Sequence, residues 1–130
     1  MACRAHSGAK KFAVKSLSEF KDLYIHRDPV DMRKNINGLS ALVKEEMKLE
    51  FHSSSLFIFC NKPRTHMKIL YFDQNGFALW LKRLEGSKFP WPKGDREEEV
   101  ISVSHLDMNL LLSGINFWNR FKDVHFEYLV

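Results

Sequence analysis

The chain has 130 residues, of which 45% are hydrophobic. This length and composition are sufficient for one domain with one hydrophobic core, and they exclude global disorder. No apolar run approaches the roughly 18–20 residues of a membrane span, and the basic N-terminus lacks the apolar stretch of about 7–15 residues found in secretory signals, so we expect a cytoplasmic protein. The net charge of +4 permits contact with a polyanion but does not require it.

The first segment, residues 1–16, holds 4 basic and no acidic side chains and shows no periodicity, which predicts a mobile basic arm. We expect residues 17–130 to form a single domain whose last residues, from 117 onward, follow no clear pattern. Residues 17–22 can begin a short helical turn, and residues 23–27 have the composition of a short strand.

The clearest helical pattern covers residues 31–48. Apolar side chains recur there at helical spacing and form one stripe, made by Met32, Ile36, Leu39, Val43 and Met47. Asp31 is placed to cap the helix and to meet the positive end of its dipole. Gly38 inside the helix costs about 1 kcal/mol relative to alanine, and such a glycine often permits close approach of another backbone.

Two strands and a hairpin follow the predicted helix. Residues 55–60 are apolar on both faces, which predicts a central strand, and residues 67–72 predict a second strand. Asn75-Gly76 between apolar runs predicts a type I′ hairpin turn, because that turn needs a positive φ at both central residues.

A turn centred on Asn75-Gly76 also predicts the register of the hairpin. The opposed pairs would be Phe72 with Leu79, Tyr71 with Trp80, Leu70 with Leu81, Ile69 with Lys82, and Lys68 with Arg83. One face would carry Leu70, Phe72, Leu79 and Leu81, and the other Ile69, Tyr71, Trp80 and Lys82. A slip of one residue would exchange the two faces.

This register collects basic side chains at the end of the hairpin opposite its turn. Residues 62–93 hold 7 basic and 2 acidic side chains, whereas residues 94–130 hold 3 and 7. The residues expected at that end are Lys62, Arg64, His66, Lys68, Lys82 and Arg83. Most charge runs are solvated faces, but several separate segments contribute here, so phosphate binding is an equal alternative.

The last patterned segments complete the fold. Residues 85–95 are a crossing punctuated by proline and glycine, and residues 100–103 can form a short strand. A helix follows, in which Ser104 and Asp107 resemble a capping box and Gly114 ends the helix. We expect an α+β fold, with an antiparallel β-meander of three or more strands packed against two helices.

Catalytic motifs are missing from the sequence. There is no glycine-rich phosphate loop, no metal-binding spacing among the six histidines, and no disulfide or zinc pattern from Cys3 and Cys60. Asp28 and Asp31 are a close carboxylate pair, but a pair at a helix start is typical of capping. We therefore expect no enzyme, no metal and no cofactor.

Two tryptophans allow two interpretations. Trp80 near Lys82, and Trp91 between Pro90 and Pro92, could be stacking groups beside cations, as in several nucleic-acid-binding folds. A core or subunit contact explains each of them more simply, because paired and buried aromatic side chains are common in both settings.

Three motifs in this order and spacing resemble a known family. They are "VDMRKNINGLSALV", "LFIFCNKPRTHMKILYFDQNGFALWLKRLEGSKFPWP" and "SHLDMNLLLSGIN". They resemble the TnpB-type, or Orf-two-like, accessory proteins of bacterial insertion-sequence family sixty-six, over about residues 23–118. The matching motif residues are Asp31, Met32, Arg33, Lys34, Gly38, Leu39, Asp73, Gly76, Lys82, Arg83, Leu84, Glu85, Phe89, Trp91 and Pro92. The resemblance implies a non-catalytic role in transposition, beside a larger transposase that cuts the DNA.

Two hypotheses of function follow. In the first, the protein assists transposition by binding DNA phosphates, through Arg33, Lys34, Lys62, Arg64, Lys68, Lys82 and Arg83. In the second, it is a protein-interaction module that binds the transposase of the same element without contacting DNA, through a surface that includes Trp80 and Trp91. Neither hypothesis involves a membrane.

Overall fold

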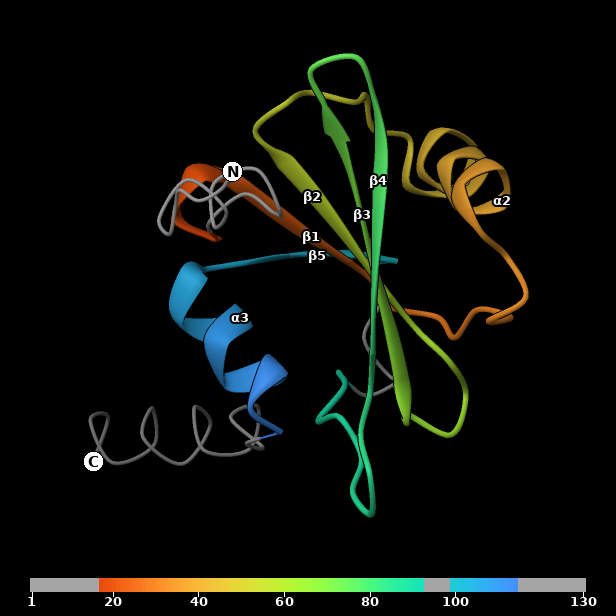
Figure 1. The fold of residues 1–130 in the computed structure, drawn as a ribbon, viewed down its shortest axis with the longest axis vertical. Coiled ribbons are helices and arrows are strands. Elements are labelled where there is room, and N and C mark those ends of the chain that lie inside the picture. The colour runs from red at the N-terminus through yellow and green to blue at the C-terminus, as the bar shows by residue number, and fades with distance from the viewer. Residues whose placement is uncertain (1–16, 93–98, 115–130) are drawn as a thin grey trace, which may run out of the picture.

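The structure is a computed structural model that describes residues 17–92 and 99–114. A five-stranded sheet has a helix on each face, so α2 and α3 lie on opposite sides of it (Figure 1). The strands are β1 (Asp22–His26), β2 (Ser55–Cys60), β3 (His66–Asp73), β4 (Gly76–Arg83) and β5 (Val100–Val103). The helical elements are a 3₁₀ turn η1 (Leu17–Glu19), α2 (Ile36–Leu42), a π-helical turn η2 (Val43–Met47) and α3 (His105–Leu112). The predicted arm of residues 1–16 lies outside the described residues.

The order of strands in the sheet is β4-β3-β2-β1-β5. Strands β2, β3 and β4 form the predicted antiparallel meander, and β5 is antiparallel to β1. Strand β1 runs parallel to β2, because the chain crosses over through α2 between them. The α+β class is therefore confirmed, although the sheet is mixed and not a pure meander.

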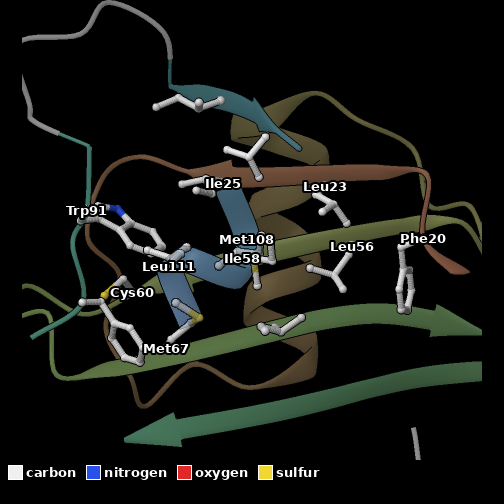
Figure 2. Packing of buried hydrophobic residues seen from close by; sticks show 14 of the residues in the cluster. Phe20, Leu23, Ile25, Leu56, Ile58, Cys60, Met67, Trp91, Met108 and Leu111 are labelled. Atoms are coloured by element: carbon white, nitrogen blue, oxygen red, sulfur yellow. The ribbon is translucent and has the colours of Figure 1, made fainter. Parts of the chain in front are cut away.

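Strand β2 lies at the centre of the sheet, and all six of its residues are buried. On one face, Met108 and Leu111 of α3 pack over Ile25 and Ile58 (Figure 2). On the other face, the α2 stripe packs against β2 and β3. This second core contains Val30, Leu39, Val43, Met47, Phe57, Phe59 and Leu70. Burial on both faces explains why β2 is apolar at consecutive positions, from Leu56 to Cys60.

The predicted apolar stripe is confirmed, but the prediction that its helix begins at Asp31 is wrong. The helix begins at Ile36, and its N-cap residue Asn35 makes no side-chain capping bond. Asp31 instead closes a turn by accepting the backbone N–H of Arg33 at 2.8 Å. Beside Gly38 lies the side chain of Lys34, and a Cβ at this position would meet Lys34 Cγ at 3.1 Å.

The hairpin forms where predicted, but its predicted register is wrong by two residues. The turn is Gln74-Asn75, with Gln74 at φ 51°, and Gly76 pairs with Asp73. Phe77 consequently lies opposite Phe72, and its ring also packs edge-on against Phe51 with centroids 4.8 Å apart. Because side chains alternate with a period of two, a two-residue shift leaves the two predicted faces of the hairpin unchanged.

The C-terminal helix α3 follows the sequence prediction closely. Ser104 Oγ accepts the Asp107 N–H at 3.1 Å, and Asp107 accepts the Ser104 N–H, so the predicted capping box is present. Gly114 lies just beyond the helix at φ 78°, in the left-handed region that favours glycine. No helix within residues 17–92 and 99–114 is long and apolar enough to cross a membrane.

Candidate nucleic-acid interface

The loop between β2 and β3 holds two cations in a defined backbone conformation. Asn61 Oδ1 accepts the N–H groups of Thr65 at 2.9 Å and His66 at 3.0 Å, which closes the loop. Arg64 takes a left-handed conformation, with φ 66°, and its N–H donates to the Asn61 carbonyl at 3.1 Å. Lys62 is exposed and Arg64 half-buried, so both side chains start from an ordered loop at the end of the sheet.

The end of β4 and the segment after it lie along the same loop and add two more cations. Arg83 pairs with His66 at the start of β3, and the Leu84 N–H donates to the Thr65 carbonyl at 2.9 Å. The Phe89 N–H donates to the Arg64 carbonyl at 2.8 Å, which brings the exposed Lys88 to this end as well. We call the resulting set the basic rim. It consists of Lys62, Arg64, Arg83 and Lys88.

One acidic side chain reduces the charge of the basic rim. Arg83 Nε donates to Glu85 Oε2 at 2.7 Å, and both side chains are well exposed to solvent. Such an exposed ion pair contributes little to stability, so a competing anion can replace it. Four cations and this one anion leave the rim with a charge of +3. Lys88 was not among the predicted site residues, because only the hydrogen bond at Phe89 brings it beside Arg64.

Lys68, which the sequence predicts as a phosphate contact, is buried inside the fold. Its side chain is on the α2 face of β3, and the residue is only 7% exposed. The Nζ ammonium donates to the carbonyls of Met32 and Lys34, each at 2.8 Å, and to Asn35 Oδ1 at 2.7 Å. All three donors of the ammonium are therefore used, so Lys68 does not belong to the binding surface. It also explains the late helix start, because it binds the backbone carbonyls of Met32 and Lys34 and the side chain of Asn35.

Arg33 and Lys34 lie on this Lys68-bound segment, on the α2 side of the sheet. Arg33 forms a bidentate ion pair with Asp31, with Nη2 and Oδ2 2.6 Å apart, and its side chain is 91% exposed. Hydrogen bonding to Arg33 lowers the pKa of Asp31 to about 2. Asp31 thus compensates one of the two cations. Lys34 lines an open hollow with Arg33 and Leu79 of β4.

Lys82 lies on the opposite face of the hairpin from Lys68 and is also engaged. Its Nζ donates to the carbonyl of Leu112 at 2.9 Å, at the C-terminus of α3. A cation is favourable there because the helix dipole places partial negative charge at that end. Of the predicted phosphate contacts, three lie in the basic rim, Arg33 and Lys34 lie on the α2 side, and Lys68 and Lys82 bind backbone carbonyls.

The two predicted partner-binding tryptophans occupy different environments. Trp91 is 7% exposed and belongs to the core on the α3 face, where its Nε1 donates to the Arg27 carbonyl at 2.9 Å (Figure 2). It is therefore not available to a partner. Trp80 is 36% exposed on β4, beside a pocket whose lining is apolar. That lining also includes Leu17, Phe20, Leu56, Ile69, Tyr71, Met108 and Leu112.

Residues 21–122 match the family model described as "IS66 Orf2 like protein". The chain belongs to the IS66 Orf2-like family. It is 32% identical over 95 residues to uncharacterized protein y4hO of Sinorhizobium fredii (strain NBRC 101917 / NGR234), covering 73% of this chain and 81% of the relative. Uncharacterized protein y4jC of the same strain is 30% identical over 100 residues, covering 77% and 83%. No solved structure matches the chain.

Membership in the IS66 Orf2-like family confirms the resemblance and implies an accessory role in IS66 transposition, in a family that is not known for catalysis. Cys60 is fully buried, and desolvation raises the pKa of its thiol to about 12. Within residues 17–92 and 99–114, no three His, Cys, Asp or Glu side chains are grouped closely enough to hold a metal ion.

Proposed function

We propose that this IS66 Orf2-like protein assists transposition by binding DNA phosphates through the basic rim, in the cytoplasm, where the element's DNA lies. The observation that supports this proposal is the gathering of four cations from two separate segments at one end of the sheet. The cutting and joining of DNA would remain the task of the transposase encoded by the same element.

The geometry of the rim favours a backbone contact over the reading of bases. Lys62, Arg64, Arg83 and Lys88 project from loops and a strand end, and no helix long enough to enter a major groove presents them. Their backbones are held by bonds at Asn61, Leu84 and Phe89, so less backbone entropy is lost on binding. We therefore expect affinity that depends on salt and depends little on DNA sequence.

Arg33 and Lys34 would extend this contact on the α2 side. Lys68 holds the backbone of this segment through the Lys34 carbonyl. His66, two residues before Lys68 on β3, is the strand partner of Arg83 in the basic rim. At the usual rise of a strand, Lys68 and His66 are about 7 Å apart, so the two groups of cations lie near each other. The exposed guanidinium of Arg33 can exchange Asp31 for a phosphate, since the ion pair is open to solvent.

The test is fluorescence anisotropy of a labelled DNA duplex over a series of salt concentrations. Replacing Lys62 and Arg64 by glutamine should weaken binding and reduce the slope of log affinity against log salt by about 1 for each lost phosphate contact. Lys44→Gln is the matched control, because Lys44 is an exposed cation on η2, away from the rim. Absence of binding at low salt, or equal slopes for all three proteins, would refute the proposal.

A second candidate function, binding of the transposase, is favoured by one observation. Trp80 is partly exposed at the edge of an apolar pocket, an arrangement typical of residues that dominate protein interfaces. Capture of the element's transposase should be reduced by Trp80→Ala and unaffected by Leu106→Ala, which removes an exposed side chain of α3. Trp91→Ala would not test this function, because loss of a buried tryptophan perturbs the core. Equal capture by the Trp80 and Leu106 variants would remove Trp80 from the interface.

A further inference from the structure

Strand β4 forms one edge of the sheet and has no partner on its outer side among residues 17–92 and 99–114. Every second residue of an edge strand directs its backbone N–H and C=O groups away from the sheet, where they can pair with another strand. At eight residues, β4 is twice as long as β5, the strand at the other edge. In Figure 1, β4 is the strand in front, with α2 and α3 to either side of it.

The composition of β4 lacks the features that usually protect an edge. Its first six residues, "GFALWL", contain neither charge nor proline, and the charges come only at Lys82 and Arg83. The described residues expose three large hydrophobic side chains, and two of them are neighbours on this edge, Trp80 at 36% and Leu81 at 54%. They project from opposite faces, so the strand is apolar on both sides of its free backbone.

We propose that β4 pairs with β4 of a second copy of this chain in an antiparallel two-fold dimer, which would join the two sheets into one of ten strands. Charge favours this occupant and this direction. Parallel pairing would place Lys82 and Arg83 beside their own copies, whereas antiparallel pairing moves the two basic ends apart. A two-fold axis perpendicular to the sheet keeps both α3 helices on one face and both α2 helices on the other.

One register uses the edge best. With Leu79 opposite Leu79 of the second copy, Trp80 lies opposite Ala78, so a large side chain meets a small one. Leu81 then lies opposite Phe77, an apolar pair on the α2 face. Arg83 comes beside the hairpin turn of the second copy, which carries the exposed Asp73, and opposite charges meet there.

This inference goes beyond the DNA-binding proposal and does not depend on it. It rests on the free edge and its apolar composition, whereas DNA binding rests on the basic rim. If both hold, the dimer carries its two rims at opposite ends of the paired strands and can contact DNA at two sites related by the same symmetry.

The experiment is sedimentation velocity on the full chain, over concentrations from about 1 μM to about 1 mM, because an interface of one strand pair is small and its dimer correspondingly weak. The wild-type chain should shift from monomer to dimer as its concentration rises. Leu81→Lys places a charge in the apolar part of the edge, opposite Phe77 of the second copy, and should abolish the shift. Leu106→Lys is the matched control, since Leu106 is 62% exposed on α3, and it should dimerise like the wild type.

A disulfide test examines the register directly, in a chain in which Cys3 is replaced by serine. Residues opposed in an antiparallel pair have Cα atoms about 4.5–5.5 Å apart, within the range that a disulfide spans. Leu79→Cys should therefore give a covalent dimer under mild oxidation, and Leu106→Cys should not. A wild-type chain that stays monomeric throughout, equal behaviour of the two lysine variants, or equal cross-linking at positions 79 and 106 would each overturn the proposal.

Discussion

Replacing Lys68 by methionine tests how a buried cation holds the segment that carries Arg33 and Lys34. Methionine keeps the apolar stem of lysine and fills a similar volume, so the α2-face core should stay packed. What it removes is the ammonium that binds the carbonyls of Met32 and Lys34 and the Asn35 side chain. The change therefore isolates the polar contribution of the lysine.

The expected loss follows from the exposure of the acceptors. Hydrogen bonds to a charged group contribute about 1.5–3 kcal/mol each, so three of them set an upper limit of about 5–9 kcal/mol. Lys34 and Asn35 are exposed, so water can replace the ammonium at those acceptors. The variant also avoids the desolvation of a buried cation, which costs several kcal/mol. We expect a net loss of about 2 kcal/mol, near the value of a single such bond.

Urea unfolding followed by circular dichroism measures this loss, and hydrogen exchange locates it. Amide protection should fall at residues 31–36 more than in β2, because the ammonium holds this segment against the sheet. Lys44→Met is the control, an exposed lysine of η2 whose replacement should change stability by less than about 0.5 kcal/mol. A Lys68→Met protein as stable as the wild type, with unchanged protection at residues 31–36, would refute the reasoning.

The remaining predictions concern three single groups. In a chain with Cys3 replaced by serine, Cys60 should react with a thiol reagent only after unfolding. Stability should fall as the pH rises from about 9 toward 12 in urea titrations, because the folded thiol, with a pKa of about 12, keeps a proton that the unfolded chain releases near 9.0. Asp31 should contribute stability above pH 3.8 that is lost as pH falls toward its folded pKa of about 2, and Asp31→Asn should flatten that part of an acid titration. Ser104→Ala should lower the free energy of unfolding by about 1 kcal/mol, and an unchanged urea midpoint would count against the capping box.

Much of the architecture follows from local patterns in the sequence. The apolar stripe of α2, the fully buried β2 and the capping box of α3 were all predictable, because each depends on residues a few positions apart. The hairpin faces were predictable for the same reason, since the alternation of Leu70, Phe72, Leu79 and Leu81 survives a two-residue shift in pairing. The resemblance to the family, too, follows from the order and spacing of three sequence motifs.

Contacts between distant residues decided the rest. The hairpin register follows the packing of Phe77 on Phe51, and α2 begins at Ile36 where Lys68 binds the preceding carbonyls. The hydrogen-bond partners of single side chains could not be predicted from the sequence either. Lys82 reaches a helix end 30 residues away, and Trp91 donates to a carbonyl 64 residues away. Composition shows that a chain carries cations and tryptophans. Their burial and their hydrogen-bond partners, however, depend on residues that only the tertiary fold brings close. Only the tertiary structure therefore separates the basic rim from the cations that bind carbonyls within the fold.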